Sequence, residues 1–243
     1  AIATAANLPF KRLQCTNDVL ASDVLGMSLW NPEQKTFQFH PGPIFTHVLV
    51  ADELNRAPSK SQSALLEAME EGRVSIDGQW HDLPQPFWVV ATQNPAEQMG
   101  TNPLPESQLD RFLIQVSLGY PDEQSEKRML ARAFEARRGS PVTALNINIE
   151  EERAKAQRVN IADNVLDYLY RLVVETRNTT HFQRGLSPRA ALGLVALSKA
   201  WAYLHRRDYV LPDDVQHVFP YVATHRVAAI TTRSSLALTL VLN

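Results

Sequence analysis

The chain has 243 residues, of which 44% are hydrophobic, so it can form one large domain or two small ones with a sizeable core. Its 24 basic and 26 acidic residues give a formal net charge of −2, which does not favour a general nucleic-acid-binding protein. The single cysteine, Cys15, excludes an intrachain disulfide and fits a reducing compartment, so we expect a cytoplasmic protein. The most apolar helix that we expect, 190–204, contains Lys199 and is too short to span a membrane.

The first third of the chain alternates between short elements. The alanine-rich segment 1–7 is typical of the end of a helix, and the alternation over 10–15 predicts a strand. Thr16-Asn17-Asp18 then predicts the cap of a helix that runs toward Gly26. Residues 36–40 alternate strictly between apolar and polar side chains, which predicts a small strand or hairpin.

A short apolar run at 48–51 ends in two carboxylates, Asp52 and Glu53, and has breakers on both sides. Such a run is typical of a buried parallel strand, and open α/β sheets bind ligands at the carboxyl ends of their strands. The pattern matches a Walker B motif, in which the aspartate holds Mg²⁺ and the glutamate polarises an attacking water. The alternative is a strand that is followed by a solvated acidic turn.

A helix over 59–71 and a hairpin over 73–80 follow, with Asp77-Gly78 as the two-residue turn. Residues 87–91 predict a second buried strand, and Asn94 comes shortly after its end. Two neighbouring parallel strands would bring Asn94 close to the acid pair, where its carboxamide could orient a water by hydrogen bonding. An asparagine before a proline is also a common turn residue.

The segment 104–113 predicts a short helix with Arg111 near its end, and 112–116 predicts a third apolar strand. At such an edge an arginine is usually a surface ion-pair residue, unless the phosphate of a second subunit reaches it. Pro121-Asp122 marks the expected boundary between an α/β core and an all-helical region.

The helical region contains five expected helices, at 122–137, 149–157, 161–177, 187–207 and 212–222. Ser187-Pro188-Arg189 opens one of them, with serine as N-cap and proline at the first position. An arginine in the first turn opposes the helix dipole, and such a conflict is expected where an anion docks. The alternative for Arg189 is an ordinary exposed arginine.

Four segments together carry a family resemblance. Residues 52–58 with 62–71 resemble the Walker B segment of MoxR-type AAA+ ATPases, and 91–95 resemble their sensor 1. Residues 104–112 resemble the segment that carries an arginine finger in AAA+ proteins, and 185–190 resemble sensor 2. The two hairpins match the inserts of the chelatase-like branch that contains MoxR. The resemblance covers about residues 1–227 with the motifs in the family's order.

This resemblance implies a fold and a division of the chain. The fold is α/β: an AAA+ core with a parallel sheet, followed by an all-α lid. We expect the core at residues 1–120 and the lid at 121–227, while the tail at 228–243 has no assigned role. A P-loop, G-x-x-x-x-G-K-[ST], is absent from the sequence, and 1–6 resemble the far end of the helix that follows the P-loop in the family. The expected core is therefore N-terminally incomplete, and we expect this chain alone to be inactive.

The resemblance also implies the roles of individual residues, with ATP and Mg²⁺ as the ligands. Asp52 would help to hold Mg²⁺, Glu53 would activate the hydrolytic water, and Asn94 would help to place it. Arg189 would touch the phosphates from the lid. Arg111 would reach the nucleotide of a neighbouring subunit, and Arg56 is a second interface candidate.

A finger acting in trans implies a ring, most often a hexamer, that remodels or activates client proteins with a von Willebrand factor A domain protein as partner. Other functions stay open at this point. The chain could be a metal-chelatase-type motor subunit or a replicative helicase of the same branch. It could also be an assembly module that does not hydrolyse ATP, although the retained Asp52 and Glu53 argue against a decayed site. A hydrolase that uses the two acids with a metal alone would need further ligands at recognisable spacing.

Overall fold

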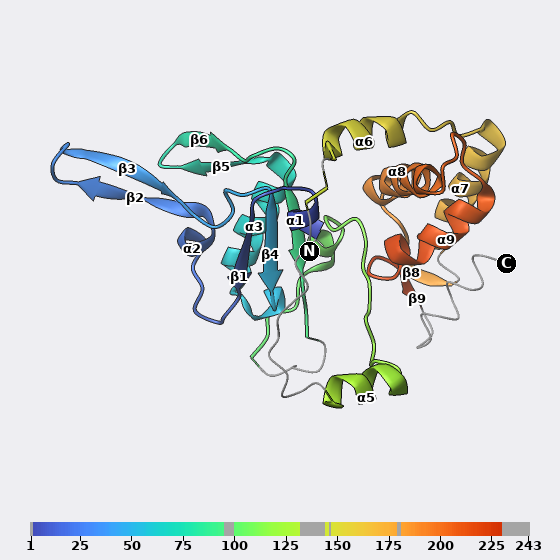
Figure 1. Cartoon of the computed structure of the whole chain (residues 1–243), viewed down its shortest axis with the longest axis horizontal. Helices are drawn as coiled ribbons and strands as arrows, with labels where there is room; N and C mark the ends of the chain where they lie inside the picture. Colours follow the sequence, from blue (N-terminus) through green and yellow to red (C-terminus); the bar gives the residue numbers. More distant parts are fainter. Residues whose placement is uncertain (1, 95–99, 132–143, 146, 179–180, 230–243) are drawn as a thin grey trace. The chain divides into compact units, whose positions relative to one another are not determined.

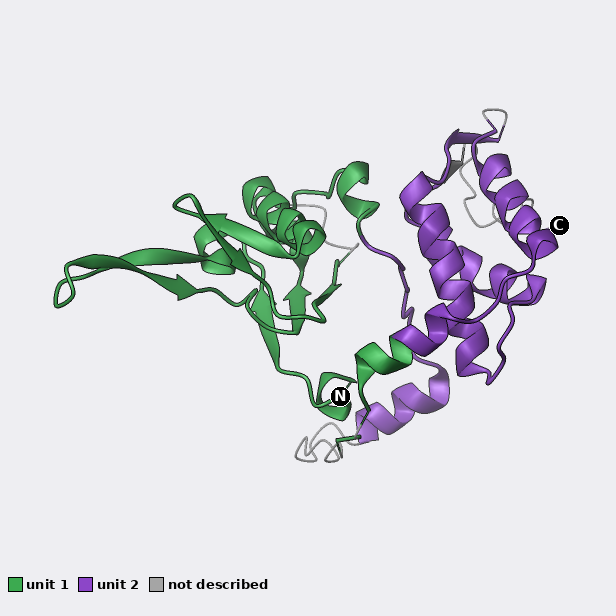
Figure 2. Cartoon of the chain, turned by 90° about the horizontal axis from the view of Figure 1, so that it is seen from above, with its two compact units in different colours: residues 1–111, 144–153 green, residues 112–143, 154–243 purple. Residues whose placement is uncertain are grey.

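The structure is a computed structural model, and it describes residues 2–94, 100–131, 144–145, 147–178 and 181–229. The chain forms two compact units, which Figure 2 shows in different colours. Unit 1 comprises residues 1–111 and 144–153, and unit 2 comprises residues 112–143 and 154–243. This division follows contacts within the chain and does not test the predicted functional boundary between core and lid, which stays a prediction.

A three-stranded parallel sheet is the centre of unit 1. It contains β1 (Phe10–Gln14), β4 (Val48–Asp52) and β7 (Trp88–Ala91) in the order β1-β4-β7. The middle strand buries Val48, Leu49 and Ala51, as its apolar run predicts. The register pairs Gln14 with Asp52 and Ala51 with Ala91, so the carboxyl ends of all three strands meet at one edge. This arrangement confirms the predicted α/β fold with a parallel sheet.

The predicted third strand at 112–116 is wrong. Within the described residues this segment forms no strand, because its backbone groups bond to a helix end of unit 2 instead. The guanidinium of Arg226 donates to the Phe112 carbonyl at 2.5 Å, and the Gln115 N–H donates to the Tyr221 carbonyl at 2.9 Å. An apolar segment becomes a strand only where a neighbouring strand accepts its hydrogen bonds.

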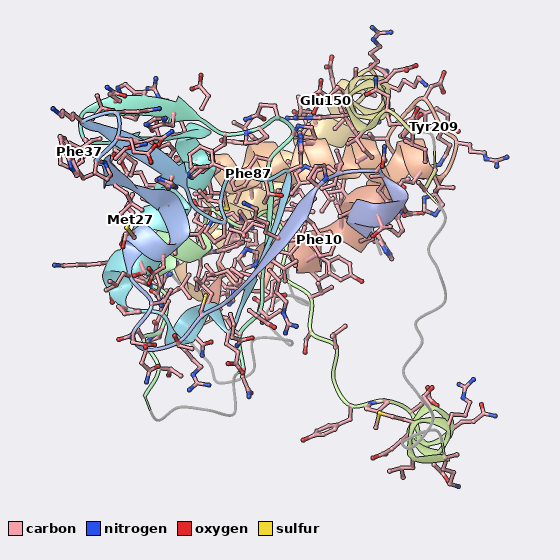
Figure 3. The ribbon with its side chains drawn as sticks, turned by 60° about the vertical axis from the view of Figure 1, so that its left-hand side comes forward. Phe10, Met27, Phe37, Phe87, Glu150 and Tyr209 are labelled. Atoms are coloured by element: carbon pink, nitrogen blue, oxygen red, sulfur yellow. The ribbon has the colours of Figure 1, made fainter. Side chains whose placement is uncertain are left out.

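Two antiparallel hairpins project from unit 1, as Figure 1 shows. The first pairs β2 (Gly26–Asn31) with β3 (Thr36–Pro41), and Figure 3 shows the side chains of Met27 and Phe37 on it. The second pairs β5 (Arg73–Ile76) with β6 (Gln79–Asp82). Its turn residues Asp77 and Gly78 have φ values of 51° and 78°, which confirms the predicted two-residue turn.

The helix predicted to run toward Gly26 is shorter than expected, because only α2 (Ala21–Leu25) is helical and β2 begins directly after it. Gly26 makes this junction possible. Its φ is 99°, and a Cβ at this position would lie 2.3 Å from the carbonyl oxygen of His40. Only glycine fits such a close approach of two backbones.

The other helices of unit 1 begin with α1 (Ile2–Ala5) and a single 3₁₀ turn, η1 (Leu54–Arg56). The predicted helix after the central strand is α3 (Ser59–Glu71), which Gly72 ends in the left-handed conformation at φ 67°. The last two are α4 (Glu106–Leu109) and α6 (Ile149–Gln157), and the residues of α6 are divided between the two units.

Unit 2 is almost entirely helical, with α5 (Glu123–Ala131), α7 (Asp163–Thr176), α8 (Pro188–Leu204) and α9 (Pro212–Ala223). Its core includes Leu169, Leu194 and Phe219. Two short strands that were not predicted, β8 (Phe182–Arg184) and β9 (Ala228–Ala229), pair antiparallel. Residues 132–137 of the predicted helix 122–137, and 230–243 of the tail, lie outside the described residues. Among the described residues, no helix combines the length and apolar character that crossing a bilayer requires.

Candidate active site

The acid pair lies where β4 ends. Asp52 is the last residue of the strand, and Glu53 follows it with φ 55° and ψ 46°, in the left-handed region. A residue other than glycine rarely adopts this backbone conformation, which costs about 1–2 kcal/mol. The turn at Glu53 ends the strand and begins η1, so the two carboxylates come from adjacent residues with different backbone conformations.

Asp52 is held by two neighbouring strands. Its Oδ1 accepts a hydrogen bond from the Thr92 hydroxyl at 2.5 Å, and its Oδ2 accepts from Nε of Arg12 at 3.0 Å. The hydrogen bond from Thr92, and then that from Arg12, holds the pKa of the Asp52 carboxyl below its ordinary value. The side chain is 20% exposed, so an ionised carboxylate is accessible at this edge.

Glu53 is held by a different set of groups. Its Oε2 accepts from Nε2 of Gln14 at 3.0 Å and from Nη1 of Arg56 at 3.2 Å. Its backbone N–H donates to the Thr92 hydroxyl at 2.9 Å. The carboxylate is 29% exposed, so it is oriented by polar neighbours and still open to solvent. These are the properties of a group that can orient a water molecule.

Gln14 and Arg12 were not among the residues singled out from the sequence, and Thr92 was included only as a member of the segment 91–95 that resembles sensor 1. They lie just beyond β7 and near the end of β1, beside Asp52 in the parallel register. The usable signal was the strand register itself, because polar residues that follow paired parallel strands converge on one edge. Asn94 is half-buried and lies three residues beyond the end of β7.

The thiol of Cys15 lies beside the acid pair without being part of it. Its N–H donates to the Asp52 carbonyl at 2.9 Å, and the residue is 1% exposed. Burial, followed by the negative charges of Asp52 and Glu53, raises the pKa of the thiol to about 11. Cys15 is therefore a neutral packing residue here and not a nucleophile.

The three arginines expected near a nucleotide are found in different surroundings. Arg56 contacts Glu53 directly. Arg111 is the last residue of the first segment of unit 1, where its Nη1 donates to the Leu66 carbonyl at 3.0 Å and forms an ion pair with Glu70. Arg189 is exposed in the first turn of α8 in unit 2.

The donor set at this edge suits a magnesium ion. Carboxylate oxygens are the ligands that Mg²⁺ takes from proteins, usually one or two of them together with phosphate oxygens and water. Asp52 and Glu53 supply such oxygens at one point of the sheet. Among the described residues, no group of three or more His, Cys, Asp or Glu could hold a metal ion. The two carboxylates therefore fit a magnesium ion that takes its remaining ligands from other molecules.

Comparisons with known proteins identify the family of this chain. Residues 1–114 match the model of the ATPase family associated with various cellular activities (AAA), and residues 174–237 match the AAA lid domain. The chain is 38% identical to Chaperone MoxR1 of Mycobacterium tuberculosis and 28% identical to Protein MoxR of Paracoccus denitrificans. A crystal structure described as that of a candidate ATPase from Cytophaga hutchinsonii matches with a TM-score of 0.86 and 34% identity, over 99% of this chain and 78% of that one. The chain belongs to the MoxR family of AAA+ ATPases.

The relatives match over most of this chain, while the chain spans only part of their length. Protein YeaC of Bacillus subtilis, which is uncharacterized, is 43% identical over 93% of this chain and 72% of its own length. For Chaperone MoxR1 the match covers 90% of this chain and 60% of the relative. For Protein MoxR of Paracoccus denitrificans the figures are 93% and 74%.

Proposed function

We propose that the native-length protein is a MoxR-type ATPase that couples Mg-ATP hydrolysis to the remodelling or activation of client proteins. The observation that carries this proposal is the acid pair at the end of β4. Asp52 is held ionised by Thr92 and Arg12, and the carboxylate of Glu53 is held by a separate set of groups, Gln14 and Arg56. One carboxylate is thus suited to a metal and the other to a water molecule.

In this proposal each group has one task. Asp52 is the carboxylate that would hold Mg²⁺, and Glu53 orients and polarises the hydrolytic water. Asn94 helps to place that water against the γ-phosphate. Bound Mg²⁺ would neutralise charge that develops on the phosphate oxygens. Positioning and charge stabilisation account for most of the catalysis in phosphoryl transfer, which explains why few protein groups are needed.

The three arginines complete the proposal. Arg189, from the lid, touches the phosphates and reports the nucleotide state to the lid. Arg111 stabilises transition-state charge on the nucleotide of a neighbouring subunit, for which it must leave Glu70. Arg56 is a second interface residue, and its contact with Glu53 would link that interface to the water-activating acid.

A finger that acts between subunits requires a ring, which we propose to be a cytoplasmic hexamer. The name Chaperone MoxR1, given to a relative of this chain, supports client remodelling as the output of hydrolysis. We also propose a von Willebrand factor A domain protein as the partner of the ring.

The chain 1–243 by itself should not turn over ATP. Its sequence contains no G-x-x-x-x-G-K-[ST] motif, so it lacks the loop amides and the lysine that bind the β- and γ-phosphates. We expect phosphate release by the purified chain to equal that of a blank without protein. Steady release above that blank, retained through a second purification step, would contradict this prediction.

The test of the function uses the native gene product, including any residues that precede Ala1, beside its Glu53→Gln variant. We expect the wild type to hydrolyse ATP and the variant to bind ATP but to turn it over at least about 100-fold more slowly. If both hydrolyse ATP alike, or if neither binds it, the proposed function is wrong and an assembly module becomes the better description.

A further inference from the structure

Thr92 makes four hydrogen bonds to four consecutive residues around the acid pair. Its backbone N–H donates to the Ala51 carbonyl and its carbonyl accepts from the Leu54 N–H, both at 2.9 Å. Its hydroxyl donates to Asp52 at 2.5 Å and accepts from the N–H of Glu53 at 2.9 Å. The backbone bonds continue the β4–β7 pairing, whereas the hydroxyl bonds are made only to the two acids.

The two hydroxyl bonds can form at the same time. A hydroxyl has one proton and two lone pairs, so it can donate to Asp52 and accept from Glu53 at the same time. The second bond satisfies the N–H of Glu53, a residue with φ 55° whose backbone conformation is unfavourable for glutamate. The hydroxyl of Thr92 therefore fixes one carboxylate through its side chain and the other through its backbone.

We infer that Thr92 is a positioning residue of the ATPase site, which sets the directions of the Asp52 and Glu53 carboxylates through its hydroxyl group. This inference rests on the proposed function. Without the hydroxyl, the N–H of Glu53 loses its partner and the left-handed turn loses a restraint. The Glu53 carboxylate then spends less time in the direction that activates water, and a displacement of about 1 Å lowers a rate by about 100-fold.

Two substitutions at Thr92 separate this role from a general role in the sheet. Thr92→Val keeps the shape and both backbone bonds but removes the hydroxyl, and Thr92→Ser keeps the hydroxyl. A matched control is Thr46→Val, because the buried Thr46 hydroxyl donates to the Pro9 carbonyl at 3.0 Å and contacts neither acid. Thr92→Ala serves as the second hydroxyl-free variant if Thr92→Val does not fold.

The kinetic test uses the native-length protein with Glu53→Gln as the reference for a lost acid. We expect Thr92→Val to lower kcat about 100-fold while KM for ATP changes less than about threefold. Thr92→Ser and Thr46→Val should stay within about threefold of the wild type in kcat. If Glu53→Gln is inactive and both hydroxyl-free variants turn over like the wild type, the inference is wrong. If Glu53→Gln itself turns over normally, the proposed function fails instead.

A second readout needs no nucleotide. Amide hydrogen exchange in the nucleotide-free protein reports the Glu53 N–H, which bonds to the Thr92 hydroxyl, and the Leu54 N–H, which bonds to the Thr92 carbonyl. In Thr92→Val we expect exchange at Glu53 to become at least about tenfold faster while Leu54 keeps its protection. Equal loss of protection at both amides, or no change at Glu53, would contradict a positioning role.

Discussion

Individual side chains at this sheet edge differ mainly in how their charge is compensated. The Asp52 carboxylate accepts hydrogen bonds from the Thr92 hydroxyl and the Arg12 guanidinium. The Glu53 carboxylate accepts them from the Gln14 amide and the Arg56 guanidinium. Arg12 is mostly exposed, so its attraction for Asp52 is screened by water and is weak enough for a metal ion to displace. Burial and the neighbouring acids all raise the pKa of the Cys15 thiol, which makes its ionisation measurable as a stability effect.

Cys15 should react with iodoacetamide only after unfolding, because its thiol is buried and has a pKa of about 11. In the unfolded chain the thiol has its ordinary pKa of 9.0, so between these values the unfolded state loses a proton that the folded state keeps. Stability therefore falls as the pH rises through this window. In urea unfolding, we expect the free energy of unfolding to fall less over this pH range in Cys15→Ala than in the wild type, because the alanine has no thiol to ionise. Parallel losses in the two proteins would show that Cys15 does not contribute.

Among the elements, the connection between α8 and α9 depends on one ion pair. Asp214 in the first turn of α9 is buried and accepts from Arg207 at 2.7 and 2.5 Å and from the Leu211 N–H at 2.7 Å. Burial alone would raise the pKa of Asp214, but the hydrogen bonds from Arg207 and Leu211 outweigh it and lower the pKa. The carboxylate thus caps one helix and anchors the chain that leaves the other.

Asp214→Asn should destabilise the chain by about 2 kcal/mol near pH 7, because it removes the buried charge that pairs with the half-buried guanidinium of Arg207. The lowered folded pKa means that this stabilisation is present above the ordinary value of 3.8 and is lost as the pH falls through the folded value. Urea unfolding followed by circular dichroism should therefore separate wild type and variant at about pH 7 and bring them together at low pH. The exposed neighbour provides the control, since Asp213→Asn should have little effect.

Several elements could be predicted because local patterns determine them. The apolar run before Asp52 gives β4, Asp77-Gly78 gives a tight turn, and the Ser187 N-cap accepts from the Ala190 N–H at 3.0 Å. The segment 112–116 has an equally apolar pattern but no strand, because pairing depends on partners distant in the sequence. The importance of Thr92 was missed for the same reason, since only the register of β4 and β7 brings its hydroxyl to the acids.

At the scale of the whole molecule, the proposed ring makes each site a product of two subunits. Neither unit alone holds all the expected groups, since the acid pair and Arg111 belong to unit 1 and Arg189 to unit 2. Arg111 bonds to Leu66 and Glu70 in its own unit in this structure. A role for this arginine in a neighbouring site can therefore be tested only by experiments that combine subunits.

Mixing two inactive variants of the native-length protein should restore ATP hydrolysis. Arg111→Ala keeps its own Glu53, and Glu53→Gln can supply Arg111 to a neighbour, so a mixed ring contains complete sites. We expect the ATPase rate of Arg111→Ala alone to fall by about 1,000-fold or more, and that of Glu53→Gln alone by about 100-fold or more. Turnover in the mixture should clearly exceed the sum of the two. The control is Glu70→Gln, which breaks the ion pair but keeps the arginine, and this variant should remain active alone. If the mixture of Arg111→Ala and Glu53→Gln hydrolyses ATP no faster than the two variants separately, Arg111 does not act as a finger in trans.

The left-handed backbone at Glu53 has a consequence for how such a sequence evolves. Glycine at this position would relieve about 1 kcal/mol of unfavourable backbone conformation and would also remove the acid. A folded chain with no need for hydrolysis would gain stability from that exchange, so selection for stability would favour it. The proposed role of Glu53 therefore has a cost in fold stability, and under this proposal a relative that has lost hydrolysis is expected to carry glycine here more often than an active one.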